Sequence, residues 1–210
     1  MDSFQTMRAI RTFCAVLGVA LLLTACGASA SASSPTAPAD NMTVIDPPLV
    51  LTDFALANSA GMTTTLADWQ QKLTLVTFGY THCPDVCPIT LAHFKQVHLA
   101  LKAYDGQVNY VFVSVDGARD TPAVLAAHLQ LFDSAIIGLT GSDAAVQVLS
   151  KQFGIYYQLE KTSPNQTDYT ITHTASSFLV DRQGRLIRIY NYNFDPQVIS
   201  ADIRQQLTAS

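Results

Sequence analysis

Apolar positions follow two different periods along residues 49–208, and the two alternate. Continuous apolar and β-branched runs are typical of buried strands. They predict strands at 49–56, 73–78, 110–115, 136–139, 156–160, 169–172, 177–180 and 186–190. Apolar residues three or four apart, or helix-start signals, predict a short turn at 65–69 and helices at 88–104, 121–132, 144–153 and from 195 onward. This alternation indicates an α/β domain with a mostly parallel sheet that ends in an antiparallel hairpin. Asp143 is the expected N-cap of the third long helix.

The first 25 residues have the pattern of an export signal. Arg8 and Arg11 precede an apolar stretch at 13–25, which is shorter than the roughly 20 residues that span a bilayer. The stretch ends in Leu-Thr-Ala-Cys and looks like a bacterial lipobox, in which Cys26 would carry the lipid and become the new N-terminus. Two alternatives stay open. Cleavage after Ala-Ser-Ala at 28–30 would release a soluble protein, and an uncleaved segment would be a short anchor.

The segment after Cys26 is rich in Ala, Ser, Thr and Pro and has no apolar period. We therefore expect a flexible tether at 26–45 and a folded domain at 46–208. The formal net charge is −4 and no basic cluster is present, which argues against nucleic acid as a partner.

Four cysteines are present, and only Cys83 and Cys87 remain after Cys14 leaves with the signal and Cys26 takes a lipid. A single pair in an exported domain of this size does not indicate a disulfide-stapled scaffold. The pair lies in FGYTHCPDVCP, residues 78–88, between a predicted strand and a predicted helix. Such a position in an α/β domain indicates a thioredoxin-like fold, with a central mixed sheet flanked by helices and a C-terminal hairpin and helix.

The spacing of the two cysteines allows two kinds of chemistry. If Cys87 lies in the first helical turn, the free N–H groups there stabilise a thiolate. Four residues of separation are compatible with a disulfide and also let both sulfurs face one soft metal ion, with copper favoured over magnesium or calcium. CxxxC is one residue longer than the common redox motif CxxC, which relaxes the geometry towards chelation. An inert disulfide or two buried thiols is the remaining interpretation.

Two thiolates can bind Cu(I), and a third ligand would complete a site for Cu(II) as well. Five histidines are available. His93, His98 and His128 lie in predicted helices and are expected to be surface or groove residues. His82 adjoins Cys83 but is expected to project to the other side, as a packing or supporting residue. His173 differs in that it ends a strand-like run in a polar neighbourhood where a hairpin begins, so it is a ligand candidate, although spacing alone does not select it.

The run FGYTHCPDVCP resembles the signature of the Sco/SenC family of copper proteins, which take part in assembling cytochrome c oxidase. VSVDGARDTP at 113–122, GLTG at 138–141 and DYTITHTASSFLVDRQGRL at 168–186 resemble further blocks of that family in the same order. The resemblance covers about residues 46–208. It implies a thioredoxin-like domain attached to a membrane outside the cytoplasm, with Cys83, Cys87 and His173 as the metal ligands.

Two positions depart from the family pattern. The family usually has Asp before the ligand histidine, where this chain has Thr172, so support of the imidazole by a carboxylate is in question. The second block usually reads Asp-Pro, where this chain has Asp116-Gly117. Asp116 and Asp120 are candidates for residues near the metal loop. The alternatives are helix capping by Asp120 and pairing with Arg119.

The resemblance implies a metallochaperone that delivers copper, Cu(I) or Cu(II), to the binuclear copper centre of cytochrome c oxidase. The alternative is a thiol–disulfide reductase that uses Cys83 and Cys87 as a redox-active pair to keep the oxidase copper-site cysteines reduced. Peroxide reduction is a third candidate, but it requires one activated cysteine beside Arg and Thr. Expected partners are the copper-bearing oxidase subunit and other periplasmic copper chaperones or thiol–disulfide reductants. The expected location is the outer face of the cytoplasmic membrane, by lipid anchor.

Overall fold

The computed structural model describes residues 41–161 and 169–209. The predicted signal peptide, Cys26 and most of the predicted tether lie outside the described residues. The strands are β1 (Met42–Val50), β2 (Ala55–Asn58), β3 (Thr63–Thr65), β4 (Leu73–Gly79), β5 (Val108–Ser114), β6 (Ile136–Thr140), β7 (Tyr157–Glu160), β8 (Thr170–His173), β9 (Ser177–Val180) and β10 (Arg185–Tyr190). The helices are α1 (Val86–Ala100), α2 (Pro122–Gln130), α3 (Asp143–Gln152) and α4 (Pro196–Thr208), with single turns η2 (Leu66–Asp68) and η3 (Lys102–Tyr104). None of the helices in these two ranges is both long and apolar enough to span a membrane.

The main sheet is mixed, with the strand order β1-β10-β9-β4-β5-β6-β2-β3. Only the β4–β5 and β5–β6 pairs are parallel, whereas the other neighbours in this sheet are antiparallel. The predicted mixed sheet is therefore confirmed, but the expectation that most of its strand pairs are parallel is wrong. The parallel pairs are those joined by α1 and α2, because a parallel connection needs a crossover. The flanking strands arrive through hairpins and longer connections, which allow antiparallel pairing.

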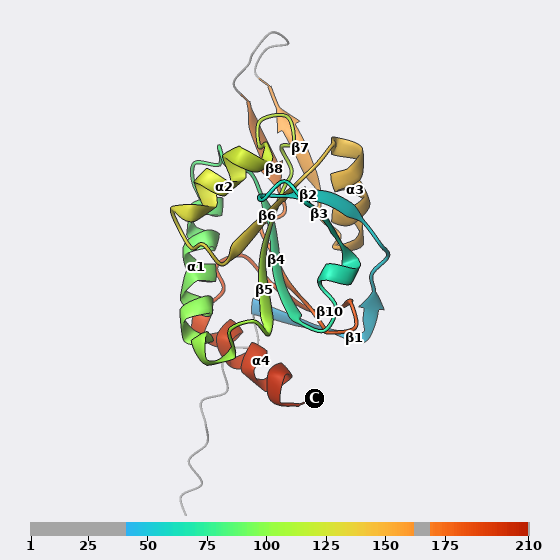
Figure 1. Ribbon diagram of the computed structural model, residues 1–210, viewed down its shortest axis with the longest axis vertical. Coiled ribbons are helices and arrows are strands. Elements are labelled where there is room, and N and C mark those ends of the chain that lie inside the picture. The colour runs from blue at the N-terminus through green and yellow to red at the C-terminus, as the bar shows by residue number, and fades with distance from the viewer. Residues whose placement is uncertain (1–40, 162–168, 210) are drawn as a thin grey trace, which may run out of the picture. The chain divides into compact units, whose positions relative to one another are not determined.

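Helices cover both faces of the sheet. In Figure 1, α1 and α2 lie on one side and α3 lies on the other, while α4 lies at the lower end, where it packs against α1. All seven residues of β4 are buried, as expected for a central strand covered on both faces. Aromatic rings fill the side that α3 covers: the Phe153 ring lies 5.4 Å from that of Phe78 and 5.1 Å from that of Phe178. This core fixes the end of β4, after which the cysteine loop begins.

Local hydrogen bonds explain two differences from the sequence prediction. The run 49–56 was expected to be one strand, but β1 ends at Val50 and β2 begins at Ala55. Between them the Asp53 carboxylate accepts hydrogen bonds from the N–H groups of Phe54 and Leu66, which turns the chain. β1 also begins at Met42, inside the segment 26–45 that was assigned to a tether.

The N-cap of α3 is Ser142, not Asp143. The Ser142 hydroxyl accepts a hydrogen bond from the N–H of Ala145, and Ser142 has the extended backbone of an N-cap residue. Asp143 is the first helical residue instead, where its carboxylate accepts a hydrogen bond from the Tyr157 hydroxyl.

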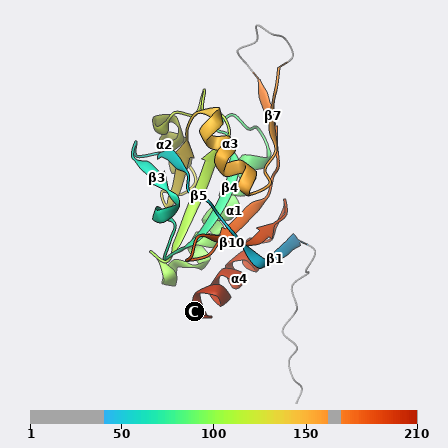
Figure 2. The ribbon, with the colours of Figure 1, turned by 90° about the vertical axis from the view of Figure 1, so that its right-hand side faces the viewer.

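β7 and β8 form a two-stranded sheet of their own. The register pairs Tyr157 with His173 and Glu160 with Thr170. In the view of Figure 2 this hairpin lies to the right of α3, and its far end extends beyond the body of the domain. The predicted arms at 156–160 and 169–172 are therefore confirmed as a strand pair, and the pair places His173 near the cysteine loop.

Candidate metal centre

The cysteine pair lies at the junction of β4 and α1. α1 begins at Val86, so Cys87 lies in its first turn, as predicted. Cys87 is 3% exposed, whereas Cys83, in the preceding loop, is half-buried. Both cysteines are free thiols. The loop therefore presents one sulfur to solvent and places the other against the core.

Gly79, the last residue of β4, makes room for the buried thiol. A Cβ atom at this position would lie 2.7 Å from the Cys87 Sγ and 2.8 Å from a ring carbon of Phe112. Such distances are far below an ordinary van der Waals contact. The glycine in the run FGYTHC thus lets Cys87 pack directly on the strand.

His173 lies at the end of β8 and faces the cysteines. Its Nε2 is 3.5 Å from the Cys87 Sγ, and its Nδ1 is 3.0 Å from the carbonyl oxygen of Thr174. A carbonyl oxygen only accepts hydrogen bonds, so Nδ1 carries the proton and Nε2 is left with its lone pair. This carbonyl supplies the support that a carboxylate at Thr172 would have given. Thr172 itself is exposed.

Three candidate ligand atoms lie within 4.8 Å of one another: the Sγ atoms of Cys83 and Cys87 and a ring nitrogen of His173. Two ligands about 2.3 Å from a shared metal ion lie at most about 4.6 Å apart. Only small side-chain shifts would let all three reach one ion. The structure thus brings together three residues that are up to 90 positions apart in the chain.

The two thiols differ in acidity because one donates a hydrogen bond to the other. The hydrogen bond from Cys87 lowers the pKa of Cys83 to about 4, against the opposing effect of partial burial. The same interaction, together with burial, raises the pKa of Cys87 well above its ordinary value. The first-turn position was expected to stabilise a thiolate on Cys87. The thiolate belongs instead to Cys83, because the hydrogen bond from Cys87 favours the charged form of Cys83 and burial further disfavours a charge on Cys87.

Asp120 fixes the start of the cysteine loop. Its carboxylate is fully buried and accepts hydrogen bonds from the N–H of Thr81 at 2.9 Å, the hydroxyl of Thr81 at 2.6 Å and the hydroxyl of Ser114 at 2.6 Å. Helix capping by Asp120 is wrong, since Thr121 caps α2 by accepting from the N–H of Val124. Asp120 therefore stabilises the loop that carries Cys83.

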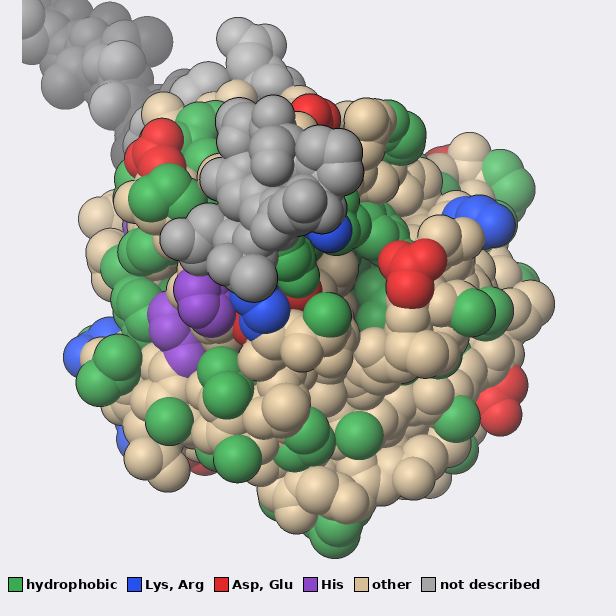
Figure 3. Space-filling model, turned by 90° about the horizontal axis from the view of Figure 1, so that it is seen from above, with side chains coloured by type: hydrophobic (Ala, Val, Ile, Leu, Met, Phe, Trp, Pro, Cys, Tyr) green, Lys and Arg blue, Asp and Glu red, His purple; other side chains and the backbone are tan. Residues whose placement is uncertain are grey.

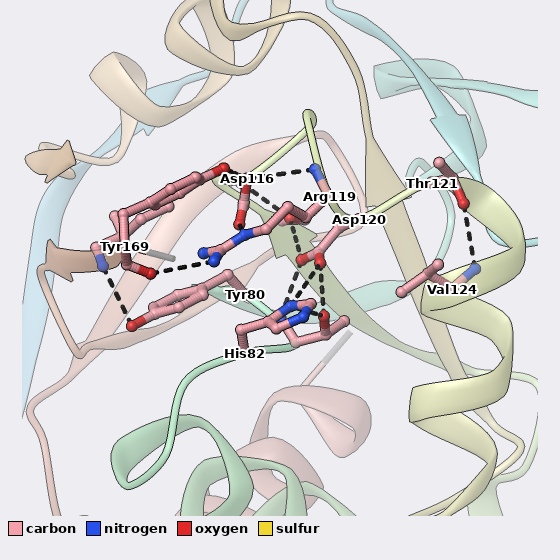
Figure 4. A network of polar contacts seen from close by, with 11 residues as sticks. Tyr80, His82, Asp116, Arg119, Asp120, Thr121, Val124 and Tyr169 are labelled. Carbon is pink, nitrogen blue, oxygen red and sulfur yellow. Dashed lines mark hydrogen bonds and ion pairs between the residues drawn. The ribbon is translucent and has the colours of Figure 1, made fainter. Parts of the chain in front are cut away.

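The other aspartate of this motif, Asp116, pairs with Arg119, which was one of the predicted alternatives. Its carboxylate accepts hydrogen bonds from Arg119 Nε and from the hydroxyl of Tyr169 at 2.7 Å, as Figure 4 shows. Gly117, in place of the usual proline, packs on Gly141: a Cβ atom at Gly117 would lie 1.9 Å from that carbonyl oxygen. A side chain does not fit there in this conformation.

The other histidines do not share the site of His173. His98 lies between Asp133, at 2.6 Å, and Asp105, at 3.2 Å. His93 and His128 lie on α1 and α2, and the ring of each packs against a phenylalanine. His82 lies 4.0 Å from Asp120 with a side chain 54% exposed. On the face that Figure 3 shows, histidine side chains (purple) lie next to the side chain of a lysine or arginine (blue).

His82, Asp116 and Asp120 also have ligand atoms within 4.8 Å of one another. Both carboxylates are already engaged by hydrogen-bond donors, namely Arg119, Tyr169, Thr81 and Ser114. A metal ion there would have to displace these donors. We therefore interpret this group as a support for the cysteine loop.

Two tyrosines near the site were not identified from the sequence. The hydroxyl of Tyr80 accepts a hydrogen bond from the N–H of Ile171, and its ring lies edge-on to the His173 ring at 6.0 Å. Tyr169 contacts Asp116 and Arg119. Both residues lie inside the quoted motifs, but nothing in the one-dimensional pattern shows which of their neighbours they contact.

The family model described as SCO1/SenC matches residues 43–208. This chain belongs to the SCO1/SenC family. The protein named sco1 of Schizosaccharomyces pombe is 33% identical over 142 residues, which is 67% of this chain and 54% of that relative. The chain thus spans about half the length of that relative.

Solved structures agree in fold. Bradyrhizobium japonicum ScoI with copper bound is 36% identical, has a TM-score of 0.69, and the match covers 75% of this chain and 99% of that one. BsSco is described as a member of the Sco family of cytochrome c oxidase assembly proteins with a disulfide switch. It is 23% identical, with a TM-score of 0.63 and coverage of 80% and 99%. The thioredoxin-like fold predicted from the sequence is confirmed.

We expect Gly79→Ala to destabilise the domain, because its methyl group would overlap Cys87 and the Phe112 ring. Overpacking of this kind lowers the free energy of unfolding by about 1–3 kcal/mol. Urea denaturation measures the loss. Adding Phe112→Leu should make the two losses less than additive, since it opens space beside residue 79. Wild-type stability of Gly79→Ala would contradict this packing.

We expect Cys83 to be alkylated before Cys87 in the reduced, metal-free protein. The hydrogen bond that lowers the pKa of Cys83 makes it a thiolate in mildly acidic solution. The rate of reaction with iodoacetamide should be half-maximal below about pH 6, compared with about 8.5 for a free cysteine. Mass spectrometry identifies the modified residue. Cys87→Ala removes the donor and should move the midpoint towards 8.5; first attack on Cys87 would refute the assignment.

Proposed function

We propose that this protein is a copper metallochaperone, with Cys83, Cys87 and His173 as the ligands of the copper that it carries. The convergence of two thiols and one imidazole Nε2 from distant segments supports the proposal most directly. Membership of the SCO1/SenC family and the likeness to a copper-bound ScoI support the choice of metal.

The donor set suits copper in both common oxidation states. Soft thiolates favour Cu(I), and the imidazole completes a site that also accepts Cu(II). The half-buried Cys83 is the sulfur that an incoming acceptor reaches first, whereas Cys87 is covered. Copper is cargo here, and it leaves by exchange of these ligands for those of the acceptor.

The proposed acceptor is the binuclear copper centre of cytochrome c oxidase. BsSco, which shares the fold, is described as belonging to a family of cytochrome c oxidase assembly proteins. The oxidase subunit that bears this centre is the proposed partner. The predicted signal peptide at 1–25 and the cysteine that follows it, Cys26, support export and lipid anchoring at the outer face of the cytoplasmic membrane.

The acidity of the thiols favours a second candidate function, reduction of the oxidase cysteines before copper arrives. Cys83 is a thiolate hydrogen-bonded to the Cys87 thiol, which is the arrangement of a nucleophile next to a resolving group. In that reaction the Cys83 thiolate attacks the target disulfide and a mixed disulfide forms. Cys87, once deprotonated, then releases the reduced target and closes the Cys83–Cys87 bridge. The two protein thiols are oxidised and two target thiols are formed.

We expect His173→Ala to weaken copper binding by roughly 100-fold or more. Loss of a supporting residue alone costs about 10–100-fold in metal affinity, and loss of a ligand costs at least as much. Competition with a chelator of known affinity measures the change. His93→Ala is the matched control, because His93 lies on α1 and belongs to neither group of candidate ligand atoms. Wild-type affinity in His173→Ala would rule out the three-ligand site.

We expect His173→Ala to keep its thiol–disulfide exchange rate within about twofold of the wild type. Exchange needs the thiolate and its access, and the hydrogen bond from Cys87 that makes Cys83 acidic is unchanged. Reduction of a small aromatic disulfide at neutral pH gives the rate. Cys83→Ser supplies the inactive control. A parallel loss of exchange and copper affinity would show that the two activities are not separable.

A further inference from the structure

The hairpin that carries His173 has little apolar contact with the domain. Of the eight residues in β7 and β8, only Ile171 is buried. A hollow of about 610 Å³ lies beside the hairpin, and its lining includes Asp116, Gly141, Ser142, Asp143, Leu159 and Tyr169. Tyr157 is half-buried and also packs against the core. The hydrophobic effect scales with buried apolar area, so one buried and one half-buried side chain fix the hairpin only weakly. Polar contacts must therefore contribute to its position.

One short segment makes several of those polar contacts. The guanidinium of Arg119 donates a hydrogen bond from Nη1 to the carbonyl oxygen of Tyr169 at 3.1 Å, and its Cζ lies 3.6 Å from the centre of the Tyr169 ring. Its Nε pairs with Asp116, which also accepts from the Tyr169 hydroxyl. Figure 4 shows the guanidinium between Asp116 and the start of β8. We name Asp116, Arg119 and Tyr169 the hairpin anchor.

The same segment also contacts the cysteine loop. Asp120 directly follows Arg119 and accepts both hydrogen bonds of Thr81, two residues before Cys83. The turn between β5 and α2 is closed by its own hydrogen bonds, from the N–H groups of Arg119 and Asp120 to the Asp116 carbonyl oxygen. The loop at 116–120 therefore contacts the histidine side of the site through Arg119 and the cysteine side through the next residue, Asp120.

We propose that Arg119, together with Asp116 and Tyr169, is a positioning element that holds His173 at ligand distance from the cysteines. None of the three belongs to the proposed ligand group. The proposal rests on the proposed function, in which His173 is a copper ligand. Without the anchor the hairpin spends less time in the position that completes the site, and apparent copper affinity falls by the same fraction.

Arg119→Lys tests the anchor without leaving the buried carboxylate of Asp116 unpaired. Lysine keeps the charge but lacks the planar fork that reaches Asp116 and Tyr169 together. Tyr169→Phe is the second variant, since it removes only the hydroxyl that donates to Asp116. Arg185→Lys is the matched control. Arg185 also pairs with an aspartate, Asp181, at 2.7 Å, just after β9. The last residue of β9, Val180, pairs with Thr74 near the start of β4, so this ion pair lies at the end of the sheet away from the cysteine loop.

Amide hydrogen exchange in the metal-free protein reads out the position of the hairpin directly. The N–H of Ile171 donates to the Tyr80 hydroxyl, so its protection reports contact between hairpin and domain. The N–H of Thr174 donates to the carbonyl oxygen of Tyr156 and serves as a control within the hairpin segment. We expect exchange at Ile171 to rise roughly tenfold in Arg119→Lys and in Tyr169→Phe, with Thr174 unchanged.

Copper affinity then shows whether the anchor acts through His173. In the wild-type background, Arg119→Lys should weaken binding roughly tenfold, whereas in the His173→Ala background it should change binding by less than about twofold. Equal losses in both backgrounds would indicate general destabilisation and overturn the proposal. Unchanged exchange at Ile171 in both anchor variants would overturn it too.

Failure of the proposed function gives a different result. If His173→Ala keeps wild-type copper affinity, the three-ligand site is wrong. Exchange at Ile171 still decides whether Arg119 holds the hairpin, because that measurement uses no metal.

Discussion

The parallel pairing of β4 with β5 is the constraint on which the site depends. The two strands are in register up to Gly79 and Ser114, their last residues. The cysteine loop and the loop at 116–120 therefore leave the sheet side by side, at the end where parallel strands of α/β sheets commonly present their functional groups. This adjacency lets the buried Asp120 accept the hydrogen bonds of Thr81.

The pair of cysteines is asymmetric because of where each lies on this frame. Gly79 lets Cys87 pack on the strand, and burial together with its hydrogen bond keeps Cys87 protonated. Cys83 is half-buried and carries the thiolate. The accessible Cys83 sulfur is suited to attack a disulfide or to pass copper on, and the covered Cys87 sulfur is suited to retain copper, so one geometry suits both proposed functions. Both candidate functions therefore use the same two atoms.

His173 reaches the site by a different route from the cysteines. Its hairpin is separate from the main sheet, and it is fixed by a few directional contacts rather than by a large apolar face. The ring itself is oriented by the carbonyl of Thr174, which leaves Nε2 facing Cys87. If His173 is the third ligand, as proposed, the site depends on the contacts that position this weakly packed hairpin.

The sequence by itself determined the central elements, since β4, α1 and β5 follow from local apolar periods, and it placed Cys87 in the first helical turn. It also selected Cys83, Cys87 and His173, though His173 stood out only through the family resemblance. It misjudged the sheet as mostly parallel, because strand pairing is a long-range contact that period does not encode. The distribution of protons between the thiols, the Thr174 carbonyl behind His173 and the Arg119–Tyr169 contact were decided only by the tertiary structure. The distribution of protons depends on burial, and the Arg119–Tyr169 contact joins residues 50 positions apart. The Thr174 contact is local, but it depends on backbone and side-chain angles that the pattern of residues does not give.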